Sequence, residues 1–394
     1  MSQNYTMNPS LRSILSIIFI LIGSMLYAQS SLSASDSFFK DTIVTSKFKV
    51  SIGGQMRLNG FYDFNALQNS ESFNITNIPT GASNTSPRFA LSVRQSRISL
   101  DAGYKSEKFG NIYTFFEGDF LGDGPLDFRL RHFWIGIKSF RVGQDWSAFC
   151  DMDVWPDVID FDGPPTGAWA RSAQVKYTKQ IENFGHFAVA FESPRASITE
   201  VPVVDSTLTS TFQGAPDLTS HLNYKGDWGH IQLAMVLRRI NFLVEEKTLA
   251  NNAGGLSLSG HFMLGKKDKF LYQANGGSGI GSYLVSFEGG GYDAVTKGGK
   301  ELSNIKSLGG YCAYEKWWSD QFKSTLVYGY MHLETEIGYT IDDTFNGHYS
   351  SANLFWLMDE NLTLGLEGQY GSVNDFSGQS GDAARIQFML LFNF

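Results

Sequence analysis

The sequence is poor in cysteine and proline and, past its amino terminus, has no long hydrophobic run. Its 394 residues include 2 Cys and 10 Pro, and two cysteines are too few for a disulfide scaffold. No window approaches the roughly 18 consecutive apolar residues that indicate a transmembrane helix. The formal net charge is −8, which argues against a nucleic-acid partner. These absences exclude a disulfide-stapled miniprotein, a helical membrane protein and a basic nucleic-acid-binding domain.

Motifs for catalysis are sparse as well. The glycine clusters at 276–281 and 289–291 lack the Lys-Ser/Thr ending of a phosphate-binding loop, and we interpret them as loop or strand-corner glycines. The seven histidines are scattered. Only His132 with Ser147 invites comparison with a hydrolase, which needs a serine, a histidine and an orienting group in hydrogen-bond reach. We therefore expect no enzyme, no cofactor and no metal site, with a membrane-embedded hydrolase as an alternative.

The carboxy terminus carries the clearest positive signal. The sequence contains 41 Gly, 32 Phe, 17 Tyr and 8 Trp, a composition that favours β structure. From Ala384 to Phe394 apolar residues occupy every second position, which is the period of a strand with one apolar face. About nine to eleven tilted residues cross a bilayer as a strand. A closing strand that ends in an aromatic residue resembles the terminal signature of Gram-negative outer-membrane barrels, which implies recognition of Phe394 by the barrel assembly machinery.

The amino terminus indicates export. Arg12 precedes the apolar run 14–26, and Ala28 is a suitable last residue before cleavage. This run has the length of a signal-peptide core and is too short to span a membrane as a helix. We interpret 1–28 as a signal peptide and 29–46 as a polar periplasmic leader, with a buried core helix as the alternative for the run. Loss of Arg12 changes the net charge from −8 to −9.

Alternating segments recur through the rest of the chain and predict a transmembrane antiparallel β-barrel over 47–394. A first strand is predicted at 48–63, a hairpin joins 96–104 to 112–120, and a tight turn at 359–361 precedes a strand from Leu362. At roughly 20 to 24 residues per strand and connection the count is about sixteen strands, enough to leave an aqueous channel. Long polar stretches such as 65–87 are predicted to be extracellular loops. A soluble secreted β-sandwich or propeller is the alternative.

Charged residues along these strands suggest a selective lumen with an inward-folded constriction loop. Five arginines are predicted to line the pore: Arg94, Arg97, Arg129, Arg131 and Arg171. The constriction segment, 144–165, carries six carboxylates: Asp145, Asp151, Asp153, Asp157, Asp160 and Asp162. Arginines around an opening lower the barrier for anions, and their planar fork suits carboxylates. Alternatively, Glu117 and Asp119 pair with the arginines for folding alone, or the acidic loop binds a cation such as calcium.

Several short motifs resemble the central signature of the DcaP-like porins. They are Leu130-Arg131-His132, Val142-Gly143-Gln144-Asp145-Trp146-Ser147-Ala148-Phe149, Asp151-Met152-Asp153, Ile159-Asp160-Phe161-Asp162-Gly163-Pro164 and Arg171-Ser172-Ala173-Gln174-Val175-Lys176-Tyr177. The resemblance implies a homotrimeric sixteen-stranded channel, similar to phosphate-selective porins, for small anions such as dicarboxylates. It also implies that Arg97, Arg129, Arg131 and Arg171 face the pore. The chain departs from the family pattern at Asp145 and Cys150 and in a leader without a coiled-coil heptad.

We therefore expect an outer-membrane porin of a Gram-negative bacterium, in contact with lipid and lipopolysaccharide. Small hydrophilic solutes, mainly anions, would cross by diffusion, because binding in a channel must stay weak enough for release. The alternative is a plugged barrel that serves as adhesin, receptor or scaffold. Cys150 and Cys312 are interpreted as separate thiols, although an oxidising periplasm permits a bridge between them.

Overall fold

The computed structural model describes residues 42–44, 47–65, 67, 71–81, 86–201, 209–244, 247–297, 301–335 and 344–394. The predicted signal peptide and nearly all of the predicted leader lie outside these residues. Strands dominate the described chain: β1 (Thr42–Val44), β2 (Phe48–Asp63), β3 (Arg88–Ser92), β4 (Arg97–Ser106), β5 (Gly110–Asp119), β6 (Arg129–Ile137), β7 (Phe140–Trp146), β8 (Arg171–Ile181), β9 (Gly185–Glu192), β10 (Ile198–Val201), β11 (Thr209–Thr211), β12 (Asp217–Gly226), β13 (Gly229–Val244), β14 (Lys247–Leu264), β15 (Asp268–Ser278), β16 (Ala294–Lys297), β17 (Glu301–Asn304), β18 (Lys306–Trp317), β19 (Phe322–Glu334), β20 (Thr344–Leu357), β21 (Leu362–Asn374) and β22 (Ser380–Asn393).

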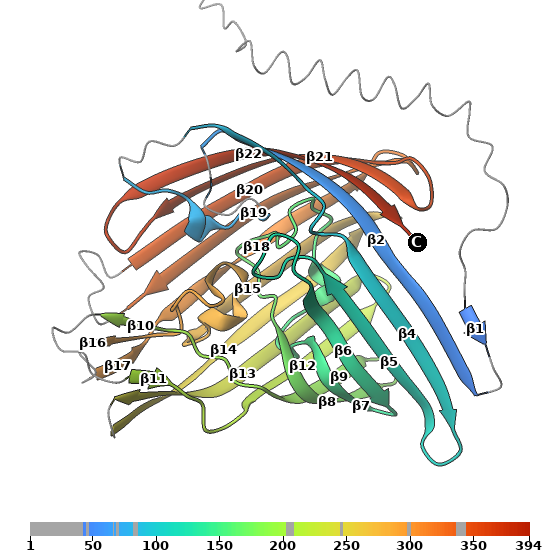
Figure 1. The fold of residues 1–394 in the computed structure, drawn as a ribbon, viewed down its shortest axis with the longest axis horizontal. Helices are drawn as coiled ribbons and strands as arrows, with labels where there is room; N and C mark the ends of the chain where they lie inside the picture. Colours follow the sequence, from blue (N-terminus) through green and yellow to red (C-terminus); the bar gives the residue numbers. More distant parts are fainter. Residues whose placement is uncertain are drawn as a thin grey trace, which may run out of the picture. The chain divides into compact units, whose positions relative to one another are not determined.

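These strands form a closed antiparallel barrel (Figure 1). From β4 to β22 each wall strand pairs with the next wall strand along the chain, with β9 pairing with β12 and β15 with β18. The wall closes where β2 pairs with β22 from Gln55↔Asn393 to Asp63↔Arg385. β3 and β4 both pair with β2 and occupy one position, while β1 and β11 are short additions. The wall therefore has sixteen strand positions, which confirms the predicted fold class. β10, β16 and β17 form a separate small sheet.

Alternation of side chains explains why these segments form a barrel. On β21, Leu366 is exposed on the outside, whereas its neighbour Glu367 is fully buried on the inside. β18 and β19 repeat the pattern with Leu308 and Leu326 outside and Tyr311 inside. An apolar outer face suits lipid and a polar inner face suits a wet lumen. No helix among the described residues is long and apolar enough to cross a membrane.

The lumen is partly filled by three segments that leave the wall. We call residues 147–170, between β7 and β8, the inserted segment; it contains the 3₁₀ helix η2 (Met152–Val154). The other two contain η1 (Ile75–Asn77) and the pair η3 (Gly281–Tyr283) and η4 (Val285–Phe287). Their apolar side chains share one buried cluster with residues on β13, β15 and β18–β22. The three segments thus fill the side of the lumen next to β13, β15 and β18–β22. On the other side, cavities lined by charged side chains remain between the inserted segment and β4–β8.

The structure corrects the predicted location of one stretch and both ends of the predicted constriction segment. The stretch 71–81 lies inside the barrel against this apolar cluster rather than in an extracellular loop, because Phe73, Ile75 and Ile78 are buried. β7 continues through Trp146, so Gln144 and Asp145 lie on the wall and not in the inserted segment. The inserted segment in turn extends to Ala170, beyond the predicted end at residue 165.

Candidate functional site

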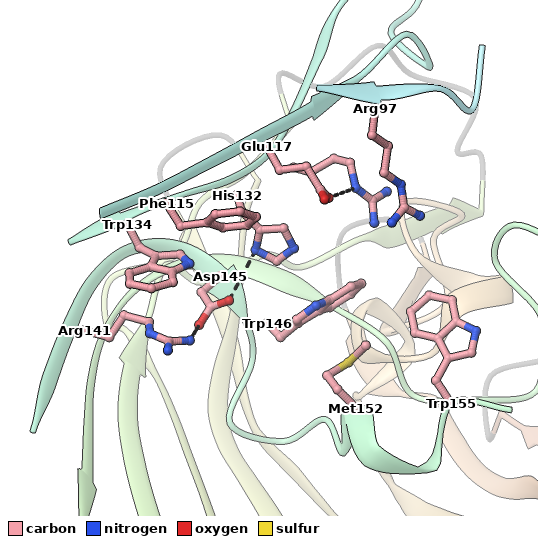
Figure 2. A pocket seen from close by; sticks show the side chains of 11 residues that line it. Arg97, Phe115, Glu117, His132, Trp134, Arg141, Asp145, Trp146, Met152 and Trp155 are labelled. Atoms are coloured by element: carbon pink, nitrogen blue, oxygen red, sulfur yellow. Dashed lines mark hydrogen bonds and ion pairs between the residues drawn. The ribbon is translucent and has the colours of Figure 1, made fainter. Parts of the chain in front are cut away.

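Two adjoining cavities lie between the inserted segment and the wall of β4–β8. The first, of about 470 Å³, is lined by Arg97, Phe115, Glu117, Arg131, His132, Trp134, Arg141, Asp145, Trp146, Met152 and Trp155. The second, of about 380 Å³, is lined by Arg129, Leu130, Arg131, Gln144, Trp146, Trp155, Asp162, Trp169, Arg171, Arg195, Val285 and Glu288. Figure 2 shows that in the first cavity Arg97, Glu117 and His132 face Trp146, Met152 and Trp155. Both cavities therefore combine arginines with aromatic rings.

Phe161 of the inserted segment lies among the predicted pore arginines. The guanidinium carbons of Arg97, Arg131 and Arg129 lie 5.0, 5.2 and 5.9 Å from the centre of its ring. Arg57 of β2 adds a fourth cation at 6.0 Å. A ring face attracts cations, so Phe161 helps to hold several like charges close together. The sequence analysis missed both Phe161 and Arg57, because nothing in their spacing shows that the inserted segment would place an aromatic ring here.

Two of the predicted arginines are paired with carboxylates of the neighbouring strand. Arg129 donates from Nε and Nη2 to the two oxygens of Asp119, at 3.0 and 2.7 Å. Arg131 contacts Glu117 at 2.6 Å and Asp119 at 3.1 Å. Such bidentate pairs are strong and directional, and they largely neutralise these cations. Arg129 and Arg131 therefore follow the alternative in which Glu117 and Asp119 pair with the arginines.

Arg97 and Arg171 differ from this pair. Among the described residues neither guanidinium has a carboxylate partner, and Arg97 Nε and Arg171 Nη1 are buried without a hydrogen-bond partner. Arg97 lies over Phe161 and lines the first cavity, whereas Arg171 lies 5.0 Å from the ring centre of Trp146 and lines the second. Each cavity thus has one cation whose hydrogen-bonding capacity is left for a solute or water.

Arg94 has another environment. It lies between β3 and β4, where Nε donates to the carbonyl of Phe120 at 3.0 Å and Nη2 donates to Gly122 and Gly124 at 2.7 and 2.9 Å. Its Nη1 is also 3.8 Å from Glu71. Arg94 therefore holds the connection between β5 and β6 in place.

Three of the six predicted constriction carboxylates contact side chains of the wall strands. Asp145 contacts Arg141, Lys176 and His132 at 2.5, 3.0 and 3.2 Å. Asp151 accepts from Ser259 at 2.6 Å and faces His230, and Asp157 pairs with Lys323. Asp153 is exposed, and its backbone N–H donates to the side chain of Asp151. Only Asp162 lines an arginine-bearing cavity as a carboxylate of the inserted segment. The expected acidic face across the opening is therefore much reduced.

Glu367 of β21 anchors the middle of the inserted segment. Its carboxylate is fully buried and accepts the backbone N–H groups of Ile159 and Asp160 at 2.9 and 3.1 Å. Asn353 and Gln369 donate to the same carboxylate at 2.9 and 2.6 Å. Burial is the main cause that raises the pKa of Asp160 to about 8, so its side chain retains a proton at neutral pH. The segment is consequently held by specific polar contacts as well as by apolar packing.

The serine and histidine considered for catalysis contact different carboxylates, and the two cysteines do not form a bridge. Ser147 Oγ donates to Glu192 at 2.8 Å, whereas His132 Nδ1 lies 3.2 Å from Asp145. Cys150 and Cys312 are free thiols, as predicted. Cys150 is buried in the inserted segment and Cys312 is exposed on β18.

Comparison with known proteins identifies the family. A family model described as DcaP outer membrane protein matches residues 24–394. The chain belongs to the DcaP outer membrane protein family. Membership confirms the resemblance found in the central motifs and places the protein in the outer membrane of a Gram-negative bacterium. No curated protein sequence matches the chain.

Solved structures share the fold of this family member at low sequence identity. The outer membrane channel DcaP of Acinetobacter baumannii has 17% identity and a TM-score of 0.77, covering 89% of this chain and 99% of that one. OmpT of Vibrio cholerae in a trimer form has 11% identity and a TM-score of 0.53, covering 89% and 100%. An anion-selective porin from Comamonas acidovorans has 12% identity and a TM-score of 0.53, covering 88% and 100%. These likenesses establish the barrel architecture.

Proposed function

We propose that the protein is a porin that admits small hydrophilic solutes through the outer membrane by diffusion, with a preference for anions. The observation that carries the proposal is the contrast among the arginines beside the inserted segment. Arg129 and Arg131 are paired, whereas Arg97 and Arg171 have no carboxylate partner among the described residues. Unpaired cations in a narrow aqueous passage attract anions and repel cations.

The two cavities suggest how a solute would pass. An anion crossing the lumen would meet Arg171 in the second cavity and Arg97 in the first. Trp146 and Trp155 line both cavities and would limit the size of the solute. A dicarboxylate can engage both cations in turn or together, so we extend the proposal to this solute class, as the family resemblance implies. Each contact is weakened by water, which permits release.

Features of related structures support the same proposal. DcaP of Acinetobacter baumannii is described as a channel and the Comamonas acidovorans protein as an anion-selective porin. OmpT of Vibrio cholerae has been solved as a trimer, and we propose a homotrimer here too. We also propose that residues 1–28 are removed on export and that Phe394 is recognised during barrel assembly.

One observation favours a second candidate, a plugged barrel that acts as adhesin, receptor or scaffold. Three segments enter the lumen and share a large apolar cluster with the wall. A complete plug would leave no conductance. The cavities along β4–β8 argue for passage, because both are lined by charged side chains and are open to solvent.

Single-channel conductance and reversal potential in a salt gradient test the proposal. Arg97→Gln and Arg171→Gln should each lower the anion-to-cation permeability ratio about fivefold, since one charge acting across water at about 4 Å contributes about 1 kcal/mol. The control is the double variant Arg129→Gln/Asp119→Asn, which leaves the net charge unchanged and leaves Arg131 paired with Glu117, so it should retain the wild-type ratio. Cation selectivity of the wild type would refute anion preference, and equal effects of all these variants would refute its origin in Arg97 and Arg171. Absence of channels would favour the plugged barrel.

A further inference from the structure

Two histidine pairs lie on the wall next to the inserted segment, away from the arginine-lined cavities. His186 of β9 and His221 of β12 place their Nε2 atoms 3.0 Å apart. His230 of β13 and His261 of β14 place their Nδ1 atoms 2.9 Å apart. These four strands follow one another in the barrel (Figure 1). Asn223 and Gln232, which are paired in the sheet, separate the two pairs along the wall.

In each pair one histidine is oriented by the inserted segment. His221 Nδ1 lies 2.6 Å from the carbonyl oxygen of Ala148, which can only accept a hydrogen bond. His230 Nε2 lies 2.7 Å from Asp151, whose same oxygen accepts from Ser259. A neutral imidazole has one N–H. Because that N–H points at the segment, the opposite nitrogen of His221 and of His230 presents a lone pair to its partner histidine.

This arrangement is the one that metal-binding histidines adopt. A ligating histidine usually donates its other N–H to a carboxylate or a backbone carbonyl, which fixes the ring. His230 has the carboxylate form of this support and His221 has the carbonyl form. Zinc–nitrogen bonds of about 2.0–2.1 Å at tetrahedral angles separate two nitrogens by about 3.3 Å. The observed pairs would need to open by only a few tenths of an ångström.

We propose that each pair is a binding site for a late first-row divalent metal ion, for which zinc is the probe. Two histidine nitrogens and water would complete the coordination, because no described group of three or more His, Cys, Asp or Glu side chains is arranged around one ion. The charge of Asp153 favours a cation at both pairs, while Lys225 opposes it near His186 and Lys269 opposes it near His261. Metal binding at these pairs thus depends on the fixed orientation of the histidine nitrogens rather than on a large negative charge around the ion.

Sequence spacing does not reveal these pairs. His186 and His221 are 35 residues apart, and His230 and His261 are 31 apart. Short-range zinc motifs place ligands within a few residues on one turn or helix. Here the sheet register opposes His230 to His261 directly, and His186 reaches His221 diagonally.

Calorimetric titration of zinc chloride into the purified, folded protein without a polyhistidine tag tests the proposal. Wild type should bind two zinc ions per chain at pH 7.5. His186→Gln keeps a donor near the position of Nε2, and His261→Asn keeps one near the position of Nδ1, so both preserve the hydrogen bond while removing a good zinc ligand. Each variant should bind one ion, and the double variant none.

His332→Asn is the matched control, because His332 faces Asn346 rather than a second histidine. It should bind two ions, and heat-dependent electrophoretic mobility should show a folded barrel for every variant. Equal zinc binding by wild type and the double variant overturns the proposal. So does wild-type stoichiometry in both single variants. In either case the histidine contacts serve as hydrogen bonds that dock the inserted segment.

Discussion

Removal of the Glu367 side chain should loosen the inserted segment and widen the channel. Glu367 accepts two backbone N–H groups, of Ile159 at 2.9 Å and of Asp160 at 3.1 Å, in a fully buried position. A buried donor left without a partner costs about 1–3 kcal/mol, so Glu367→Ala should destabilise the docked segment by about 2–6 kcal/mol. Lumen water can replace part of the loss, which favours the lower end of this range.

A loss of about 2 kcal/mol changes the ratio of docked to undocked segment about 30-fold. The segment would not leave completely, because the carbonyl of Ile159 also accepts from Arg57 and Gln387. We therefore expect larger and noisier single-channel currents. Limited proteolysis of the folded protein should produce new cuts within residues 147–170, located by mass spectrometry.

Glu315→Ala provides a graded control. Glu315 accepts one backbone N–H from the inserted segment, that of Asp157 at 2.8 Å, so its removal should have about half the effect on segment docking. The reasoning is refuted if Glu367→Ala forms a folded barrel with wild-type conductance, noise and protease resistance. It is also refuted if Glu315→Ala has the larger effect.

Other predictions concern the closing seam, the thiols and one buried carboxyl. Arg385→Ala should lower the free energy of unfolding in urea by about 1–3 kcal/mol, because buried Asp63 loses its bidentate partner and among the described residues keeps only Arg88, at 3.3 Å; an unchanged midpoint would contradict this. At pH 8 a maleimide that partitions into detergent should modify Cys312, which lies on the outer face of β18 with Leu308, but not Cys150, since burial raises the pKa of the Cys150 thiol to about 12; mass spectrometry of the folded protein counts the adducts. Because burial raises the pKa of Asp160 to about 8, its protonation adds stability that is complete below about pH 4 and is lost as the pH rises through about 8. Thermal unfolding at pH 5 and pH 9 should show a smaller difference for Asp160→Asn than for wild type.

The barrel could be predicted because its signal is local and repeated. The alternation at the carboxy terminus corresponds to β22, and the predicted first strand, 48–63, coincides with β2. The outer face of these strands meets lipid and the inner face meets the polar lumen. Apolar and polar residues therefore alternate along each strand. Period and length were therefore sufficient to infer the strand number.

The filled side of the lumen could not be predicted in the same way. Phe73 and Ile75 stand in a polar stretch, and Leu284 and Phe287 lie near glycine clusters. These short apolar groups form no sustained period, and their burial depends on wall residues contributed by strands far away in sequence. Loops that enter a barrel are stabilised by such tertiary contacts, so local propensity is a weak guide to them.

The surplus positive charge beside the inserted segment was predictable, but its location was not. Three arginines of β4 and β6 flank β5, whose carboxylates are Glu117 and Asp119, so positive charge exceeds negative charge on these strands. In the sheet Asp119 lies opposite both Arg97 on β4 and Arg129 on β6. A register shift between Glu117 and Gly118 places Arg131 within reach of both carboxylates. The bulge therefore decides that Arg97 is the cation left for a solute.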